Sequence, residues 1–284
     1  MKDLITLGIH YGSFLSFPFL LGVLWLLGKK RFQALAIFFV ILSVSFIWAR
    51  FYEPQMLIVR EESGPANFVL IADTHLGQYK GARFMERVVN QINALEPDFI
   101  LFPGDFVYSI APEDIDEFFS PLTQLDAPLY ATLGNHDMAP AGELTDDLLL
   151  TSLEDYGVTW IDNKSVTFDG IQLIGIGELW NDDADLSTFD QLQPELTNIV
   201  LAHNPDTAYL FEDIDVDLIV SGHTHGGQIR IPFLYRMVIP CEYNWGTAQG
   251  WFTVLGNPLY ITSGLGETGL PLRLFNPPEV VHFN

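Results

Sequence analysis

Five of the seven histidines lie in short polar motifs that follow runs of apolar residues. The motifs are Asp73-Thr74-His75, Gly104-Asp105, Gly134-Asn135-His136-Asp137, His203 and Gly222-His223-Thr224-His225-Gly226-Gly227. One histidine at the end of a strand is commonly structural, but five that are joined by Asp and Asn need another explanation. Such a cluster is costly to bury unless a cation neutralises it, and a pair of divalent metal ions would do so.

The side chains in these motifs also indicate which metals would bind. They offer imidazole, carboxylate and amide oxygen atoms but no thiolate, since Cys241 is the only cysteine. This mixture favours Mn, Fe, Zn, Co or Ni over a calcium or magnesium site lined by oxygen alone. A single cysteine also excludes an intramolecular disulfide, and we expect Cys241 to be a small buried hydrophobic residue.

Short apolar runs that alternate with amphipathic segments must position the motifs. The predicted strands are Phe68–Ala72, Phe99–Phe102, Leu129–Leu133, Ile199–Ala202 and Leu218–Val220, and Arg83–Leu95 has the apolar spacing of a helix. Asp169-Gly170 predicts an antiparallel hairpin between 165–168 and 171–174. Strands and helices in this order predict an α/β fold. Because ligands of such folds bind beyond the carboxyl ends of the strands, the motifs should converge on one site.

In order and spacing, the motifs resemble those of the calcineurin-like metallophosphoesterase superfamily. The matching residues are Asp73-x-His75, Gly104-Asp105, Gly134-Asn135-His136, His203 and Gly222-His223-x-His225. The resemblance runs from about residue 66 to the C-terminus and implies a four-layer α/β/β/α sandwich. Residues 222–228, Ser263-Gly264-Leu265-Gly266 and Leu272-Arg273 are similar to a membrane-associated bacterial branch. That branch includes phosphodiesterases often described as UDP-2,3-diacylglucosamine hydrolases.

The resemblance implies a role for each matching residue in a centre of two divalent metal ions. Asp73, His75, Asp105 and His225 would hold one ion, and Asp105, Asn135, His203 and His223 would hold the other. The two cations would polarise the phosphoryl oxygens while a hydroxide between them attacks phosphorus. Asp105 would give one carboxylate oxygen to each ion, and His136 would donate a proton to the leaving oxygen.

One position departs from the family pattern. Many relatives have a second Asp three residues after the Asp of the Gly-Asp motif, where it orients the catalytic histidine. Tyr108 occupies this position here. Either the Tyr108 hydroxyl or a nearby carboxylate such as Asp137 supports His136, or proton transfer is less efficient.

Residues 4–49 are almost uncharged, although the chain has a formal net charge of -23. Leu4–Leu27 and Phe32–Trp48 are long enough to cross a bilayer as helices, and Gly28-Lys29-Lys30-Arg31 lies between them. We therefore predict a transmembrane hairpin in residues 1–52, with helices at about 4–27 and 32–49. A linker at 53–65 and a phosphoesterase domain at 66–284 would follow. The alternative is a signal peptide, but the first run is too long and its positive charges follow it.

The distribution of charge also bears on the location of the domain. The positive-inside rule places the Lys29–Arg31 turn in the cytoplasm and the domain outside a bacterial inner or plasma membrane, although Lys2 and Arg50 oppose this bias. His10 within the first apolar run is either a functional residue or a neutral histidine that faces the second helix.

The substrate is less well defined by the sequence. Residues 233–252 include Tyr235, Tyr243, Trp245, Trp251 and Phe252, which either pack together or form a wall for a lipid or nucleoside group. Arg230 and Arg273 are candidates for a phosphate contact or for salt bridges. The chain has only 13 basic residues, and they are spread along it without forming the patch that a phosphate backbone needs, which argues against nucleic acid as a partner.

These features predict a hydrolase of a phosphodiester or pyrophosphate bond, with a lipid-linked substrate near the membrane. A UDP-2,3-diacylglucosamine pyrophosphatase of lipid A biosynthesis and a phosphomonoesterase are alternatives. A catalytically inactive scaffold is a third, but the complete set of candidate ligands argues against it.

Overall fold

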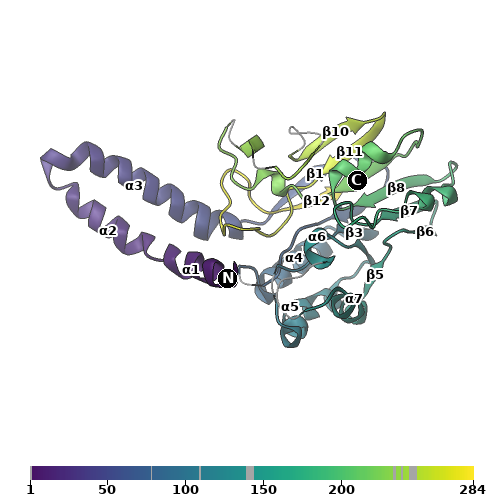
Figure 1. Cartoon of the computed structure of the whole chain (residues 1–284), viewed down its shortest axis with the longest axis horizontal. Coiled ribbons are helices and arrows are strands. Elements are labelled where there is room, and N and C mark those ends of the chain that lie inside the picture. The colour runs from purple at the N-terminus through teal and green to yellow at the C-terminus, as the bar shows by residue number, and fades with distance from the viewer. Residues whose placement is uncertain are drawn as a thin grey trace.

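Two mixed β-sheets form the body of the protein in the computed structural model (Figure 1). The structure describes residues 2–77, 79–108, 110–138, 144–232, 235–237, 239–242 and 248–284. Within these residues, the first sheet has the order β1-β12-β2-β3-β4-β5 and the second has the order β10-β11-β9-β8-β7-β6. The strands of the first sheet are β1 (Ile58–Glu62), β2 (Phe68–Leu70), β3 (Phe99–Pro103), β4 (Leu129–Thr132), β5 (Val158–Trp160) and β12 (Glu279–Phe283). Those of the second are β6 (Lys164–Phe168), β7 (Ile171–Ile176), β8 (Thr197–Ala202), β9 (Leu218–Ser221), β10 (Gly250–Val254) and β11 (Asn257–Ile261).

The central strands of both sheets are parallel. In the first sheet β2, β3, β4 and β5 pair in parallel, and in the second sheet β7, β8, β9 and β11 do so. The edge strands β6 and β10 pair antiparallel with their neighbours. The five strands expected from the sequence and the antiparallel hairpin at Asp169-Gly170 are confirmed.

The alternation of side chains along each strand builds the core between the sheets. In β2, Phe68 and Leu70 belong to the cluster between the sheets, together with Leu173 and Leu201 of the second sheet. Val69 belongs instead to the cluster on the outer face of the first sheet. Because successive side chains of a strand point to opposite faces, each strand serves two apolar layers.

Helices cover the outer face of each sheet, which confirms the predicted four-layer arrangement. The first sheet is covered by α4 (Ala82–Asn93), α5 (Ile115–Phe119) and α7 (Asp146–Asp155). The buried face of α4 contains Phe84, Val88 and Ile92, whose spacing places them on one side of the helix. On the second sheet the outer layer consists of short 3₁₀-helices, at Leu186–Gln191 and Pro205–Leu210, rather than of α-helices.

The N-terminal apolar residues form a helical hairpin that projects away from the sheets (Figure 1). It contains α1 (Lys2–Ser13), α2 (Ser16–Leu26) and α3 (Gln33–Ile47), and α3 continues as a π-helix at Trp48–Tyr52. The first apolar run is therefore two helices rather than the single helix predicted. Leu7–Leu26 and Lys30–Gln55 are long and apolar enough to cross a membrane. His10 faces the second arm, because its Nδ1 lies 2.9 Å from Nη2 of Arg50.

The predicted linker at 53–65 is wrong in part. Residues 58–62 form β1, an edge strand of the first sheet that pairs in parallel with β12. The preceding segment is docked as well: Glu53 is buried, and the carbonyl oxygens of Pro54 and Gln55 accept hydrogen bonds from Lys80 and Arg87. The sequence concealed this because the polar residues Glu61 and Glu62 suit an exposed edge strand as well as a linker.

Candidate metal centre

The candidate ligands lie at the carboxyl ends of neighbouring parallel strands. Asp73 and His75 follow β2, and Asp105 follows β3. Asn135 begins α6 (Asn135–Met138) beyond β4. His203 follows β8, and His223 and His225 follow β9. These loops from both sheets meet at one site, where Oδ2 of Asp105 lies 3.4 Å from Nε2 of His203.

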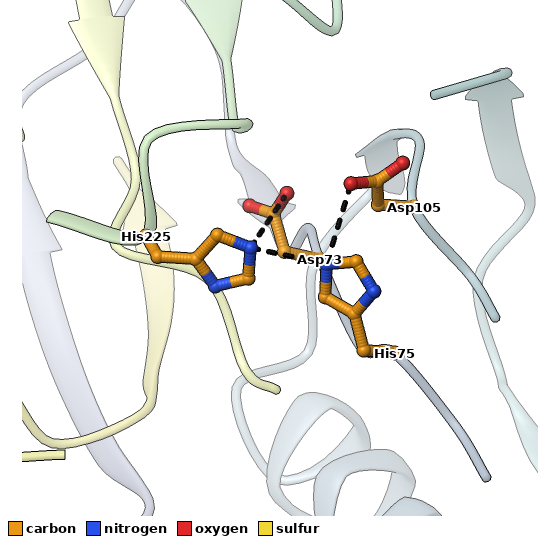
Figure 2. A group of neighbouring side chains, drawn as sticks. All are labelled: Asp73, His75, Asp105 and His225. Carbon is orange, nitrogen blue, oxygen red and sulfur yellow. Dashed lines mark hydrogen bonds and ion pairs between the residues drawn. The ribbon is translucent and has the colours of Figure 1, made fainter. Parts of the chain in front are cut away.

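One group of side chains is formed by Asp73, His75, Asp105 and His225 (Figure 2). One ligand atom from each residue lies within 4.8 Å of all the others, and all four residues are buried. Nε2 of His75 is 3.0 Å from Nε2 of His225 and 3.3 Å from Oδ2 of Asp105. Two imidazole lone pairs that face each other at this distance repel unless a proton or a cation lies between them. The group therefore fits a divalent metal ion.

A second group surrounds His203. Its Nε2 lies 3.4 Å from Oδ2 of Asp105, 3.2 Å from Oδ1 of Asn135 and 3.1 Å from Nδ1 of His223. Oδ2 of Asp105 is therefore shared by the two groups. This differs from the expectation that each carboxylate oxygen faces one ion, because Oδ1 accepts a hydrogen bond of 2.9 Å from the backbone N–H of His136.

Backbone carbonyl groups fix which nitrogen of each imidazole faces the second group. Nδ1 of His203 donates to the carbonyl oxygen of Pro103 at 2.7 Å, and Nε2 of His223 donates to that of Pro240 at 3.0 Å. In the neutral form of each ring, the other nitrogen then has a lone pair directed into the group. Hydrogen bonds of this kind orient metal-binding histidines and set their tautomers.

The site is electrostatically strained without a cation. Burial raises the pKa of Asp73 to about 6. Burial would also raise the pKa of Asp105, but His203 and His75 lower it well below its usual value. For His203, the carboxylate of Asp105 outweighs burial and raises the pKa to about 10. A bound divalent cation would favour ionised carboxylates and neutral imidazoles, and would thus remove this conflict.

The backbone of the site is strained too. Five candidate ligands adopt left-handed conformations with positive φ: Asp73 at 52°, His75 at 42°, Asp105 at 61°, His223 at 67° and His225 at 49°. Such conformations cost roughly 1–3 kcal/mol each for residues other than glycine and cluster at functional sites. Close packing also requires Gly134, because a Cβ there would lie 2.2 Å from Oδ1 of Asp105.

His136 lies beside the first group rather than within it. Its ring is 4.8 Å from that of His75 and 5.8 Å from that of Tyr108. Both oxygens of the Asp137 carboxylate accept hydrogen bonds from backbone N–H groups, which argues against the suggestion that Asp137 supports His136. The donors are Asp105, Phe106, Val107 and Gly134, at 2.7, 2.8, 3.2 and 3.0 Å. Of the two residues suggested as a support for His136, Tyr108 is the one whose ring lies beside the His136 ring.

Among the predicted substrate residues, Arg273 does not face the site. It is completely buried, and its guanidinium donates to the carbonyl oxygens of Ser263, Gly264, Gly266 and Asn276. The suggested phosphate contact of Arg273 is therefore wrong, and its role is to hold the loop that packs against Asp73.

The aromatic segment is only partly described. Tyr243 and Trp245 lie outside the described residues. Arg230 lies over the ring of Tyr235, 4.9 Å from its centre, so its contact with a phosphate stays a prediction. Trp251 belongs to β10 and packs edge-on against Tyr260, which favours the packing alternative for this residue.

Trp180 is a candidate that the sequence analysis missed. Its ring lies 4.4 Å from the ring of His223 and is nearly perpendicular to it, and the residue is 45% exposed. It belongs to the loop after β7, at the same end of the second sheet as His203. The position of this loop beyond a predicted strand could have identified it, but the loop contains no histidine.

The comparison with known families agrees with this geometry. The calcineurin-like phosphoesterase family matches residues 66–227, which is more than half of the chain. The chain therefore belongs to the calcineurin-like phosphoesterase family. It is a metal-dependent hydrolase that acts on phosphate esters.

Several relatives are similar over nearly the whole chain. The uncharacterized metallophosphoesterase YkuE of Bacillus subtilis is 31% identical over 90% of this chain and 94% of its own length. Phosphodiesterase YaeI of Escherichia coli is 29% identical over 82% of this chain and 87% of its own. UDP-2,3-diacylglucosamine pyrophosphatase LpxG of Chlamydia muridarum is 28% identical over 84% of this chain and 92% of its own.

Proposed function

We propose that the chain hydrolyses a phosphodiester or pyrophosphate bond with two divalent transition-metal ions. The observation that carries this proposal is the position of Oδ2 of Asp105, 3.3 Å from Nε2 of His75 and 3.4 Å from Nε2 of His203. Asp73, His75 and His225 would complete one ion site, and Asn135, His203 and His223 would complete the other. The mixed nitrogen and oxygen ligands suit Mn, Fe, Zn, Co or Ni.

Different residues of the chain would have different roles in the reaction. Bound cations would supply charge stabilisation at the phosphoryl oxygens and lower the pKa of a water molecule. His136, beside the first group, would donate a proton to the leaving oxygen. Tyr108 would limit the orientations of its ring, and Trp180 would offer an exposed face to the group attached to phosphorus. Arg230 is proposed as a phosphate contact.

We further propose that the substrate is linked to a lipid. Two apolar helices precede the domain, and Leu7–Leu26 and Lys30–Gln55 would anchor it in a bacterial inner or plasma membrane. The turn with Lys29, Lys30 and Arg31 would lie in the cytoplasm and the domain on the opposite side. A reporter such as alkaline phosphatase fused to the C-terminus would be active in this orientation and inactive in the reverse one.

One specific alternative follows from the relatives. LpxG of Chlamydia muridarum bears the name of a UDP-2,3-diacylglucosamine pyrophosphatase, and the similarity covers 84% of this chain. The same pyrophosphatase activity is the second candidate for this chain. Release of UMP from UDP-2,3-diacylglucosamine by the purified protein would support it.

The bond class is tested with chromogenic esters and the full chain in detergent. With Mn²⁺, we expect hydrolysis of bis-p-nitrophenyl phosphate and much slower hydrolysis of p-nitrophenyl phosphate. Hydrolysis of the monoester alone would favour the phosphomonoesterase alternative. If neither ester were cleaved and no metal were bound, the proposed function would be wrong.

A further inference from the structure

A cavity of about 330 Å³ lies against the metal centre. His225 forms part of its wall. The wall also contains the backbone of Gly227 and the side chains of Ile229, Pro240 and Leu270. The volume is in the range of small-molecule sites, and the lining suits an apolar group better than a phosphate.

A second cavity, of about 370 Å³, lies where the hairpin meets the domain. Gly8 and Gly12 of α1 form one side, Arg50 of the π-helix forms another, and Leu270 and Pro271 close it from the domain. Leu270 therefore lines both cavities. Because α1 and the π-helix belong to the arms of the hairpin, the second cavity lies at the base of the candidate membrane spans.

The polar side of the second cavity is formed by residues that hydrogen-bond to one another. Arg50 is buried, and its Nε donates to Oγ of Ser13 at 3.1 Å while its Nη2 lies 2.9 Å from Nδ1 of His10. Neither of these partners is a carboxylate, and the carboxylate of Glu267 acts on the guanidinium only through a coulombic interaction, so the charge of Arg50 lies at the edge of an apolar chamber. Ionisable residues at the depth of a membrane helix commonly mark the path of a substrate.

Space is left on α1 for an additional apolar group. A Cβ added at Gly8 or at Gly12 would meet no atom within 4 Å. On the domain side of the cavity, Leu270 is 45% exposed, so its side chain is open to contact with an apolar group.

We propose that the two cavities bind an acyl chain of a lipid phosphate ester. The phosphorus would lie at the metal centre, and the chain would pass Leu270 into the cavity between α1 and the domain. There the guanidinium of Arg50 would contact an ester or amide oxygen of the lipid. The proposal rests on the proposed function, and it assigns the apolar hairpin a part in substrate selection as well as in anchoring.

The test uses two chromogenic diesters that differ only in chain length, p-nitrophenyl ethyl phosphate and p-nitrophenyl hexadecyl phosphate. The full chain with Mn²⁺ is assayed in one detergent, and the measured quantity is the ratio of kcat/KM for the long ester to that for the short one. We expect the unmodified chain to prefer the long ester at least tenfold. In Gly12→Leu, which fills the second cavity, this ratio should fall to about one third or less of its value, mainly through KM.

Two further variants separate the alternatives. Gly22→Leu is the matched control, because Gly22 lies in α2, also has no atom within 4 Å of an added Cβ, and does not line the cavity. Its ratio should equal that of the unmodified chain. Leu270→Asp, which places a charge on the shared wall, should lower the ratio as Gly12→Leu does.

The outcomes distinguish this proposal from the function on which it rests. If the unmodified chain cleaves both diesters without preference, the acyl-chain site is wrong and the hydrolase function stands. An unchanged ratio in both Gly12→Leu and Leu270→Asp would overturn the site as well, even if both rates fell together. If neither diester nor bis-p-nitrophenyl phosphate is cleaved, the function itself fails.

Discussion

The carboxylate of Asp137 provides a severe test of how the site is held together. It accepts three backbone hydrogen bonds from the loop that contains Asp105 and a fourth from Gly134, and it is completely buried. Asp137→Ala would leave four buried N–H groups without this acceptor. Each unsatisfied group costs about 1–3 kcal/mol, so the expected loss is at least ~4 kcal/mol and reaches ~12 kcal/mol. Because a domain is stable by only about 5–15 kcal/mol, this variant should lose a large share of its stability and unfold at a much lower temperature.

Asp137→Asn gives a graded version of the same test. The asparagine side chain keeps the shape of the aspartate and one of its two oxygen atoms. Its NH₂ group would face the backbone N–H groups that donate to the second oxygen in the unmodified protein. Two of the four hydrogen bonds are lost, which corresponds to about 2–6 kcal/mol. For a domain of this size, about 1 kcal/mol lowers Tm by roughly 2–4 °C, so we expect a decrease of at least ~4 °C.

The assay is thermal unfolding of the full chain, followed by tryptophan fluorescence in detergent. It is performed with excess EDTA, because bound metal stabilises the folded state and a weakened site would add to the shift. Asp190→Ala, at an exposed position of the 3₁₀-helix Leu186–Gln191, is the matched control and should change Tm by less than ~2 °C. If Asp137→Ala unfolded within ~3 °C of the unmodified chain, the amide-binding role of this carboxylate would be refuted.

Three further predictions concern the metal centre. Elemental analysis should find that Asp105→Ala has lost bound metal. His136→Ala should retain its metal, and its kcat should fall by about 10²–10⁴-fold. If Asp105→Ala were loaded with metal and active, the assignment of Asp105 as a shared ligand would be contradicted. Since the pKa of His203 is raised to about 10, its imidazole carries a proton at pH 8 that a metal must displace. Calorimetry in two buffers of different ionisation enthalpy should therefore show release of about one proton per His203 site, with affinity rising as pH rises toward 10; the same heat in both buffers would count against it. Trp180→Ala should raise KM for bis-p-nitrophenyl phosphate by up to roughly tenfold with a smaller change in kcat, and an unchanged KM would show that its ring does not meet the substrate.

Much of the fold and of the site could be predicted because the relevant signals are local. Each central strand is a short apolar run, and each motif follows its run directly, so the rule that ligands bind beyond parallel strands was sufficient. Asp73, Asp105 and His225 were found in this way, and the structure brings them together.

The errors arose where the decisive information is not local. Arg273 was suggested as a phosphate contact because basic residues are few, but the carbonyl groups that surround it come from a folded loop. Residues 58–62 were assigned to a linker because their partner strand, β12, lies more than 200 residues away in the sequence. Trp180 was missed for a similar reason, since only the fold places it against His223.

The backbone conformations were also beyond prediction. Asp and His are enriched among residues with positive φ, but most of them adopt ordinary conformations, so residue type alone does not predict the positive φ of Asp73, His75 and Asp105. Hydrogen bonds from the loop backbone to the carboxylate of Asp137 help to hold the strained conformation. These are contacts between segments that are distant in the sequence, so the local sequence does not show them.

The pairing of β1 with β12 has a practical consequence for where this chain can be cut. A truncated protein that begins at residue 66, where the family match starts, would lack β1 and expose the backbone donors and acceptors of β12 along an open edge. Such edges recruit other chains, so this form is prone to aggregation even if its active site is intact. A version that begins at Glu53 would keep the edge covered. It would also keep the hydrogen bond from the backbone N–H of Asn276 to Glu53, and it is the better starting point for a soluble protein.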